Sequence, residues 1–86
     1  MKTDLIKNII NIVSWGLGNS DPISISNDED LILLGLSSIS FVTIIVSLEE
    51  EFQITIPNEK LILSQMNTID KISEIIEMEM EKNNEY

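Results

Sequence analysis

Two adjacent serines, Ser37 and Ser38, are the residues of this sequence best placed to take part in chemistry. They follow Gly35 and stand at the start of an apolar, helix-forming stretch. Taken alone, such a pair indicates helix capping, because a serine oxygen accepts hydrogen bonds from the free N–H groups of a first turn. A serine nucleophile would need a neighbouring base, and the chain contains no histidine. We therefore predict no catalytic residues.

The acidic run from Asp28 to Asp30 is the other group of side chains that could bind a ligand. An EF-hand loop that began at Asp28 would need glycine at its sixth position and glutamate at its twelfth. The sequence has Leu33 and Ile39 at those places. We predict a solvated acidic loop and no metal site.

The charge of the chain limits its partners. Fifteen acidic residues stand against five lysines, which gives a formal net charge of −10 in 86 residues. This charge disfavours nucleic acids and anionic membranes as ligands, because both require basic surfaces. A basic protein partner is favoured, although an acidic surface can also serve only solubility.

Length and hydropathy indicate one domain, 1–86, with its core over about 3–80. The longest apolar stretch, 39–48, is too short to span a membrane and contains polar side chains. Signal peptide features are absent and the chain begins with Met1, so we expect a discrete cytoplasmic protein, monomeric in solution.

Apolar periodicity predicts an all-α fold, a small four-helix bundle with three longer helices, one short helix and a long loop between the first two. We expect an aliphatic core whose large side chains are Trp15, Phe41 and Phe52. Outward-facing glutamates are expected on the last helix. The first predicted helix starts near Thr3 and ends by Gly16. The other three cover 38–52, 58–63 and a segment from Asn67 or Thr68 to Glu81. The tail 82–86 is expected to fray.

The helix over 38–52 has one apolar stripe more than a bundle helix needs. Its core stripe contains Phe41, Ile44, Ile45, Leu48 and Phe52. A second stripe, made of Ile39, Val42 and Val46, is displaced by about a third of a turn. This stripe either contacts other proteins or widens the core face beneath a neighbouring helix.

The region around the serines resembles the acyl and peptidyl carrier proteins. That family shows a Leu-Gly pair, an Asp-Ser-Leu triplet that opens its second helix, a Leu-Glu-Glu-Glu-Phe ending and then Ile-Pro. The corresponding residues here, in order and at the family spacing, are Leu34-Gly35, Ser37-Ser38-Ile39, Leu48 to Phe52 and Ile56-Pro57. Ser37 replaces the usual aspartate, and Leu33 stands where an acidic residue is common.

The resemblance implies that Ser38 receives 4′-phosphopantetheine from coenzyme A through a phosphopantetheinyl transferase. The arm would then carry acyl, aminoacyl or peptidyl cargo as a thioester. Further partners would be an adenylation or acyl-loading enzyme and downstream synthase or condensing enzymes. The resemblance implies a partner-docking face made of Leu36, Ser37, Ile39, Val42, Thr43, Val46, Glu49 and Glu50.

The outward positions Ser40, Thr43 and Ser47 are neutral, whereas fatty-acid carriers usually have acidic residues from the first turn of this helix. The sequence therefore favours a carrier for nonribosomal peptide or other specialised-metabolite biosynthesis over a fatty-acid carrier. A third alternative, of a different class, is an acidic helical adaptor that has no prosthetic group.

Overall fold

The first helix, α1 (Lys2–Gly16), forms because its apolar residues recur at helical spacing. Leu5, Ile9 and Val13 are buried on one face, as the pattern predicts. The computed structural model describes residues 2–83 and starts this helix at Lys2, one residue before the predicted cap. Gly16 ends it, as predicted, and a side chain there would overlap Ile44 of the next helix.

The long connection 17–37 is an extended loop that ends in a short 3-10 turn, η1 (Leu31–Leu34). The buried Ser14 hydroxyl accepts a hydrogen bond from the Ile23 N–H at 3.0 Å, and Ile25 lies in the core. The Asp30 carboxylate caps η1 by accepting the Ile32 N–H at 3.0 Å. These contacts hold the connection between α1 and α2 against the rest of the protein.

The second helix, α2 (Ser38–Phe52), has the bounds that the sequence predicts. Ile44, Ile45 and Leu48 are buried, and the two phenylalanines pack partly buried against the core. The helix ends at Gln53, which has a left-handed backbone with φ 54°.

The predicted short helix over 58–63 is wrong in form. Two separate 3-10 turns, η2 (Asn58–Lys60) and η3 (Leu63–Gln65), take its place, and neither has a side-chain cap. The all-α class is confirmed for residues 2–83, where three α-helices and no strands are found. A single helical turn fixes several dihedral angles for few hydrogen bonds, so tertiary contacts decide whether it continues.

The last helix, α3 (Ile69–Asn83), begins where Thr68 Oγ1 accepts the Lys71 N–H at 3.1 Å. Its buried stripe is the predicted one: Ile69, Ile72, Ile75 and Ile76. Glu79 does not face outward as expected, because it is only 6% exposed and its carboxylate lies 3.8 Å from the Lys60 ammonium. The helix continues through Asn83, so 82–83 belong to it, while the rest of the predicted tail lies outside the described residues.

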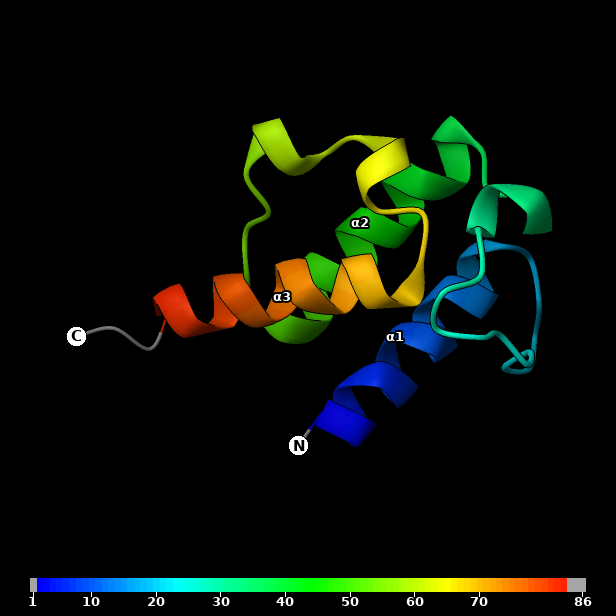
Figure 1. Ribbon diagram of the computed structural model, residues 1–86, viewed down its shortest axis with the longest axis horizontal. Coiled ribbons are helices and arrows are strands. Elements are labelled where there is room, and N and C mark those ends of the chain that lie inside the picture. The colour runs from blue at the N-terminus through cyan, green and yellow to red at the C-terminus, as the bar shows by residue number, and fades with distance from the viewer. Residues whose placement is uncertain (1, 84–86) are drawn as a thin grey trace.

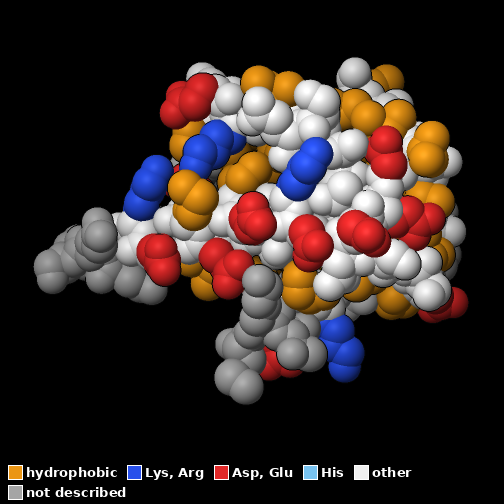
Figure 2. Space-filling model, viewed as in Figure 1, with side chains coloured by type: hydrophobic (Ala, Val, Ile, Leu, Met, Phe, Trp, Pro, Cys, Tyr) orange, Lys and Arg blue, Asp and Glu red, His pale blue; other side chains and the backbone are white. Residues whose placement is uncertain are grey.

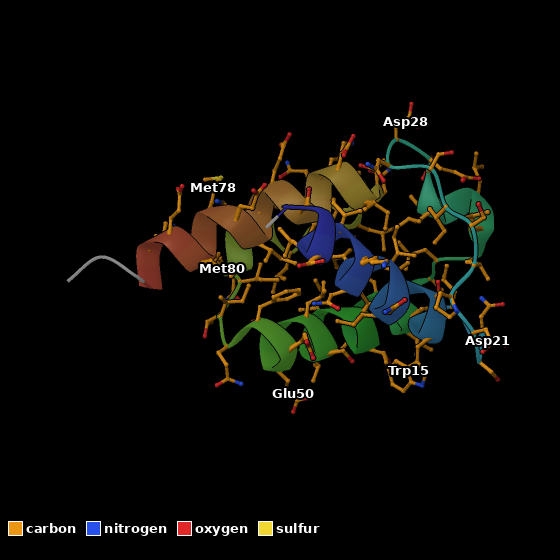
Figure 3. All side chains as sticks on the ribbon, turned by 90° about the horizontal axis from the view of Figure 1, so that it is seen from below. Trp15, Asp21, Asp28, Glu50, Met78 and Met80 are labelled. Atoms are coloured by element: carbon orange, nitrogen blue, oxygen red, sulfur yellow. The ribbon has the colours of Figure 1, made fainter. Side chains whose placement is uncertain are left out.

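The three α-helices enclose one core, with α1 packed against both α2 and α3 (Figure 1). Trp15 was expected inside this core, and that prediction is wrong. Its side chain is 59% exposed at the end of α1 and points away from the helices (Figure 3). Within 2–83, no helix has both the length and the apolar character that crossing a membrane requires.

Candidate functional site

The hydroxyl groups of Ser37 and Ser40 hold each other at the start of α2. The Ser37 oxygen accepts the Ser40 N–H at 3.3 Å, and the Ser40 oxygen accepts the Ser37 N–H at 3.3 Å. The two oxygens are 2.8 Å apart and share a further hydrogen bond. This reciprocal arrangement is a capping box, in which both side chains are occupied by the helix start.

Ser38 lies between these two serines and is not part of the cap. Its residue is exposed, and no described residue forms a hydrogen bond with its hydroxyl. The residues before Ser38 fix its position. Gly35 turns the chain with φ 104°, and the side chain of Leu36, the next residue, is buried in the core. The free hydroxyl is therefore held at the first position of a helix, open to solvent.

This position suits a covalently attached anion. The first turn of a helix carries partial positive charge, which favours a phosphate group by about 0.3–1 kcal/mol. No charged residue occurs from Leu31 to Leu48, so no carboxylate of this segment competes with that phosphate. The chain has no histidine to activate the hydroxyl. The exposed hydroxyl at the start of the helix therefore fits an attached phosphodiester.

The second stripe of α2 is exposed. Ile39 is 83% exposed, and Val42 and Val46 are also exposed. The alternative that Val42 and Val46 widen the core face beneath α1 or beneath the predicted short helix, 58–63, therefore does not hold. These three branched apolar side chains are only partly covered by the protein and are accessible to another molecule.

The other predicted docking residues have different surroundings. Leu36 is only 6% exposed and belongs to the core, so its side chain cannot meet a partner, which corrects that expectation. Thr43 is exposed, and its hydroxyl donates to the Ile39 carbonyl at 3.2 Å. The Glu49 carboxylate accepts the Ile56 N–H at 2.8 Å and is half-buried, whereas Glu50 is exposed at the opposite end of the helix from Ser38 (Figure 3).

A mainly apolar groove of about 410 Å³ begins at Ser38 and follows α2. Leu61, from the segment between η2 and η3, forms its opposite wall. The residues that line it are Ser38, Phe41, Val42, Ile45, Val46, Glu49 and Leu61. Sequence periodicity placed Phe41 and Ile45 in the core and could not show this opening, because the wall at Leu61 comes from a distant segment.

The sequence also missed an exposed apolar turn. Of the four apolar residues of η1 only Leu31 is buried, whereas Ile32, Leu33 and Leu34 are exposed. A 3-10 turn has three residues per turn, so consecutive side chains point in different directions and cannot all reach the core. The run of four apolar residues in the sequence could have indicated this exposure, since four consecutive side chains cannot share one face.

Asp30, from the acidic run, has a structural role. Besides capping η1, its carboxylate accepts a hydrogen bond from the Asn67 side-chain amide at 3.0 Å. Within the described residues, no three histidine, cysteine, aspartate or glutamate side chains form a group that could hold a metal ion.

The structure thus describes a small all-helical chain with an exposed serine, Ser38, at the start of α2. The family model of the phosphopantetheine attachment site matches residues 8–76. The chain belongs to this family, whose members carry covalently attached 4′-phosphopantetheine. The resemblance and the cofactor predicted from the sequence are thereby confirmed. A search among curated proteins finds no significant match.

Proposed function

We propose that this protein is a carrier in which Ser38 bears the phosphopantetheine arm. The observation that supports Ser38 most directly is the difference in hydrogen bonding among the three serines at the start of α2. Ser37 and Ser40 are engaged in the capping box, and only the hydroxyl between them is left without a partner among the described residues. The arm supplies a thiol that holds cargo as a thioester, a group that the chain lacks because it contains no cysteine.

The residues of the chain present and orient the attachment point. The capping box fixes the first turn of α2, and the buried Leu36 prevents the preceding residues from swinging away. The N-terminal end of α2 favours the negative charge of the phosphodiester. We expect the transferase to remove the proton from the Ser38 hydroxyl, and we propose that the chain itself is not an enzyme.

We propose that the cargo belongs to nonribosomal peptide or other specialised-metabolite biosynthesis rather than to fatty-acid synthesis. The first three turns of α2 support this reading because they are uncharged, with Thr43 exposed and Ser40 and Ser47 half-buried. The proposed partners are a transferase, an adenylation or acyl-loading enzyme, and a downstream synthase or condensing enzyme. Monomeric state and cytoplasmic location stay predictions from the sequence.

The docking face of the proposal consists of Ile39, Val42, Thr43, Val46 and Glu50, next to the backbone of Ser37. The exposure of the apolar stripe supports this assignment. We expect a small interface and brief complexes, because a carrier must leave one enzyme to reach the next.

Intact mass spectrometry tests the attachment site. The protein is incubated with coenzyme A and a broad-specificity phosphopantetheinyl transferase, and the expected product is heavier by one phosphopantetheine group. Ser38→Ala should abolish the addition, while Ser37→Ala should still be modified. Failure of the wild type to gain this mass, or addition to Ser38→Ala, would contradict the proposal and favour an adaptor or another site.

A second measurement addresses the cargo. The protein is isolated from its native cells, and the mass of the group attached to it is determined. An aminoacyl or peptidyl thioester agrees with the proposed pathway class. A series of saturated acyl chains that differ by two carbons would instead identify a fatty-acid carrier.

A further inference from the structure

Asn67, the second residue before α3, connects two segments that are far apart in the sequence. Its backbone carbonyl accepts the Leu31 N–H at 2.7 Å, and its side-chain amide donates to Asp30 Oδ1 at 3.0 Å. The amide oxygen accepts a hydrogen bond from the Lys71 ammonium at 3.0 Å. Figure 1 shows the same proximity, since the chain just before η1 passes the start of α3. Both ends of the Asn67 amide are therefore engaged at this junction.

The start of α3 is a fixed base for this junction. Ile69 and Ile72, in its first turn, are buried in the core. A further hydrogen bond joins the same two segments, because the Asp70 N–H donates to the Asn27 carbonyl at 2.9 Å. The loop before η1 is thus held to a part of the protein that the core keeps in place.

Two short links lead from Asn67 to the attachment site. The first runs through Asp30, because the carboxylate oxygen that accepts the Asn67 amide also caps η1. The second runs through the backbone of Leu31, whose N–H donates to Asn67 and whose carbonyl accepts the Leu36 N–H at 3.1 Å. Leu36 stands two residues before Ser38. The position of the first turn of α2 therefore depends on how η1 is held.

Side chains alone hold this region weakly. Between Asp30 and Ser38, only Leu31 and Leu36 are buried, and the other residues are exposed. A segment with few buried contacts opens at a low free-energy cost. The hydrogen bonds to the start of α3 therefore limit the motion of η1, and with it the motion of the Ser38 hydroxyl.

We propose that Asn67 is a positioning residue for phosphopantetheine transfer. It acts through η1 rather than on Ser38 itself: it holds the turn against α3, and the turn presents the hydroxyl to the transferase. The inference rests on the proposed function, since it takes Ser38 as the attachment site. A reacting oxygen that is already held in place loses less orientational freedom when the reactive complex forms, and the reaction is faster for that reason.

Asn67→Ala tests this role, because it removes the amide and keeps the backbone carbonyl. The probe is a broad-specificity phosphopantetheinyl transferase with coenzyme A, and the full chain is the varied substrate. We expect kcat to fall about tenfold, since the hydroxyl is less often in the reactive arrangement. KM for the carrier should change less than about twofold, because no residue of α2 is altered.

The matched control is Thr68→Ala, at the neighbouring position. It removes the Thr68 hydroxyl that accepts the Lys71 N–H at 3.1 Å, so it weakens the start of α3 without removing a hydrogen bond to η1. Both kinetic constants should stay unchanged in this variant. Assays are run at a temperature at which circular dichroism shows every variant folded, so lower stability by itself cannot reduce kcat. An equal fall of kcat in the two variants would overturn the inference.

An exchange of the two side chains gives an independent test. Asn67→Asp places a second carboxylate beside Asp30, on a molecule whose acidic side chains already follow α3 across the front in Figure 2. Like charges at this distance repel, and kcat should fall as it does in Asn67→Ala. Adding Asp30→Asn restores one amide and one carboxylate at the original net charge, and kcat should return to within about twofold of the wild type. A double variant no faster than Asn67→Asp would contradict the proposal.

Backbone dynamics can be measured without the enzyme. Order parameters from ¹⁵N relaxation should be about 0.85 for residues 31–38 of the wild type and should drop below about 0.6 there in Asn67→Ala, with α1 unchanged. Equal values for 31–38 in the two proteins would overturn the inference. If Asn67→Ala does not fold, Asn67→Gln, which displaces the amide by one methylene, replaces it in both measurements. Wild type that is not modified at all would instead overturn the proposed function.

Discussion

The helices α2 and α3 have the same length of 15 residues and differ in the side that faces away from the core. Each buries one stripe of aliphatic residues, and the stripe of α3 consists entirely of isoleucines. Outside that stripe, α3 carries mostly charged side chains, among them Asp70, Lys71, Glu74 and Glu81. The outer side of α2 carries Ile39, Val42 and Val46 instead.

The comparison separates what folding requires from what function adds. A charged outer face on α3 is the normal solution for a helix at the surface of a bundle. The apolar outer face on α2 has no partner within residues 2–83, so packing does not explain it. In the proposed function, this face lies beside the Ser38 hydroxyl and contacts the enzymes that act on it.

The largest effect on stability is expected from the inner side of α2. Leu48 is completely buried, and Leu48→Ala should lower the free energy of unfolding by about 2–5 kcal/mol in urea denaturation. Val46→Ala, on the outer side, is the matched control and should change it by less than about 0.5 kcal/mol. Similar losses in the two variants would show that the outer stripe is part of the fold.

The close approach of α1 and α2 should give the next largest effect. A Cβ atom at Gly16 would overlap Ile44 Cγ1, so Gly16→Ala should cost about 1–3 kcal/mol although alanine favours helices. In an Ile44→Ala background the same substitution should cost less, which a double-mutant cycle in thermal unfolding can measure. Equal costs in both backgrounds would argue against this contact.

The caps of the two helices should contribute similar, smaller amounts. Ser37→Ala and Thr68→Ala each remove a side-chain acceptor for a first-turn N–H and should each cost about 1 kcal/mol. Only Ser37→Ala should also slow phosphopantetheine transfer, because it loosens the turn that presents Ser38. A slower transfer for Ser37→Ala alone, with similar losses of stability in the two variants, would support the difference between α2 and α3. An equally slow transfer for Thr68→Ala would contradict it.

The smallest effect on stability is expected for Val42→Asp. Val42 is exposed, so the free energy of unfolding should change by less than about 0.5 kcal/mol. Cargo loading should nevertheless slow about tenfold, because a charge would lie in the docking face. Stopped-flow or gel-based loading assays and chemical denaturation measure the two quantities, and parallel losses would contradict the assignment.

Much of the candidate site could be predicted from local sequence. The Ser37 cap, the start of α2 at Ser38 and the two stripes of that helix all depend on residues within a few positions of each other. Helical periodicity and capping chemistry act over the same short range, which explains the agreement.

Other features depended on contacts that no local pattern contains. Trp15 is exposed although large aromatic residues are commonly buried, because the face of α1 that meets the core is already filled by Leu5, Ile9 and Val13. Glu79 is buried because lysines from two segments, Lys60 and Lys82, approach its carboxylate. The turns η2 and η3 replace a predicted helix because contacts with distant segments determine the conformation of so short a segment.

The order of residues is enough to set the three main helices, the Ser37 cap and the membership in the family, because each rests on short-range spacing. The fold alone decides which apolar side chains remain in water. It buries Leu36, exposes Leu33 three positions earlier, and brings Leu61 opposite Ser38 to form the groove. These outcomes depend on how distant segments share a limited core, and that competition is resolved only when the whole chain is packed.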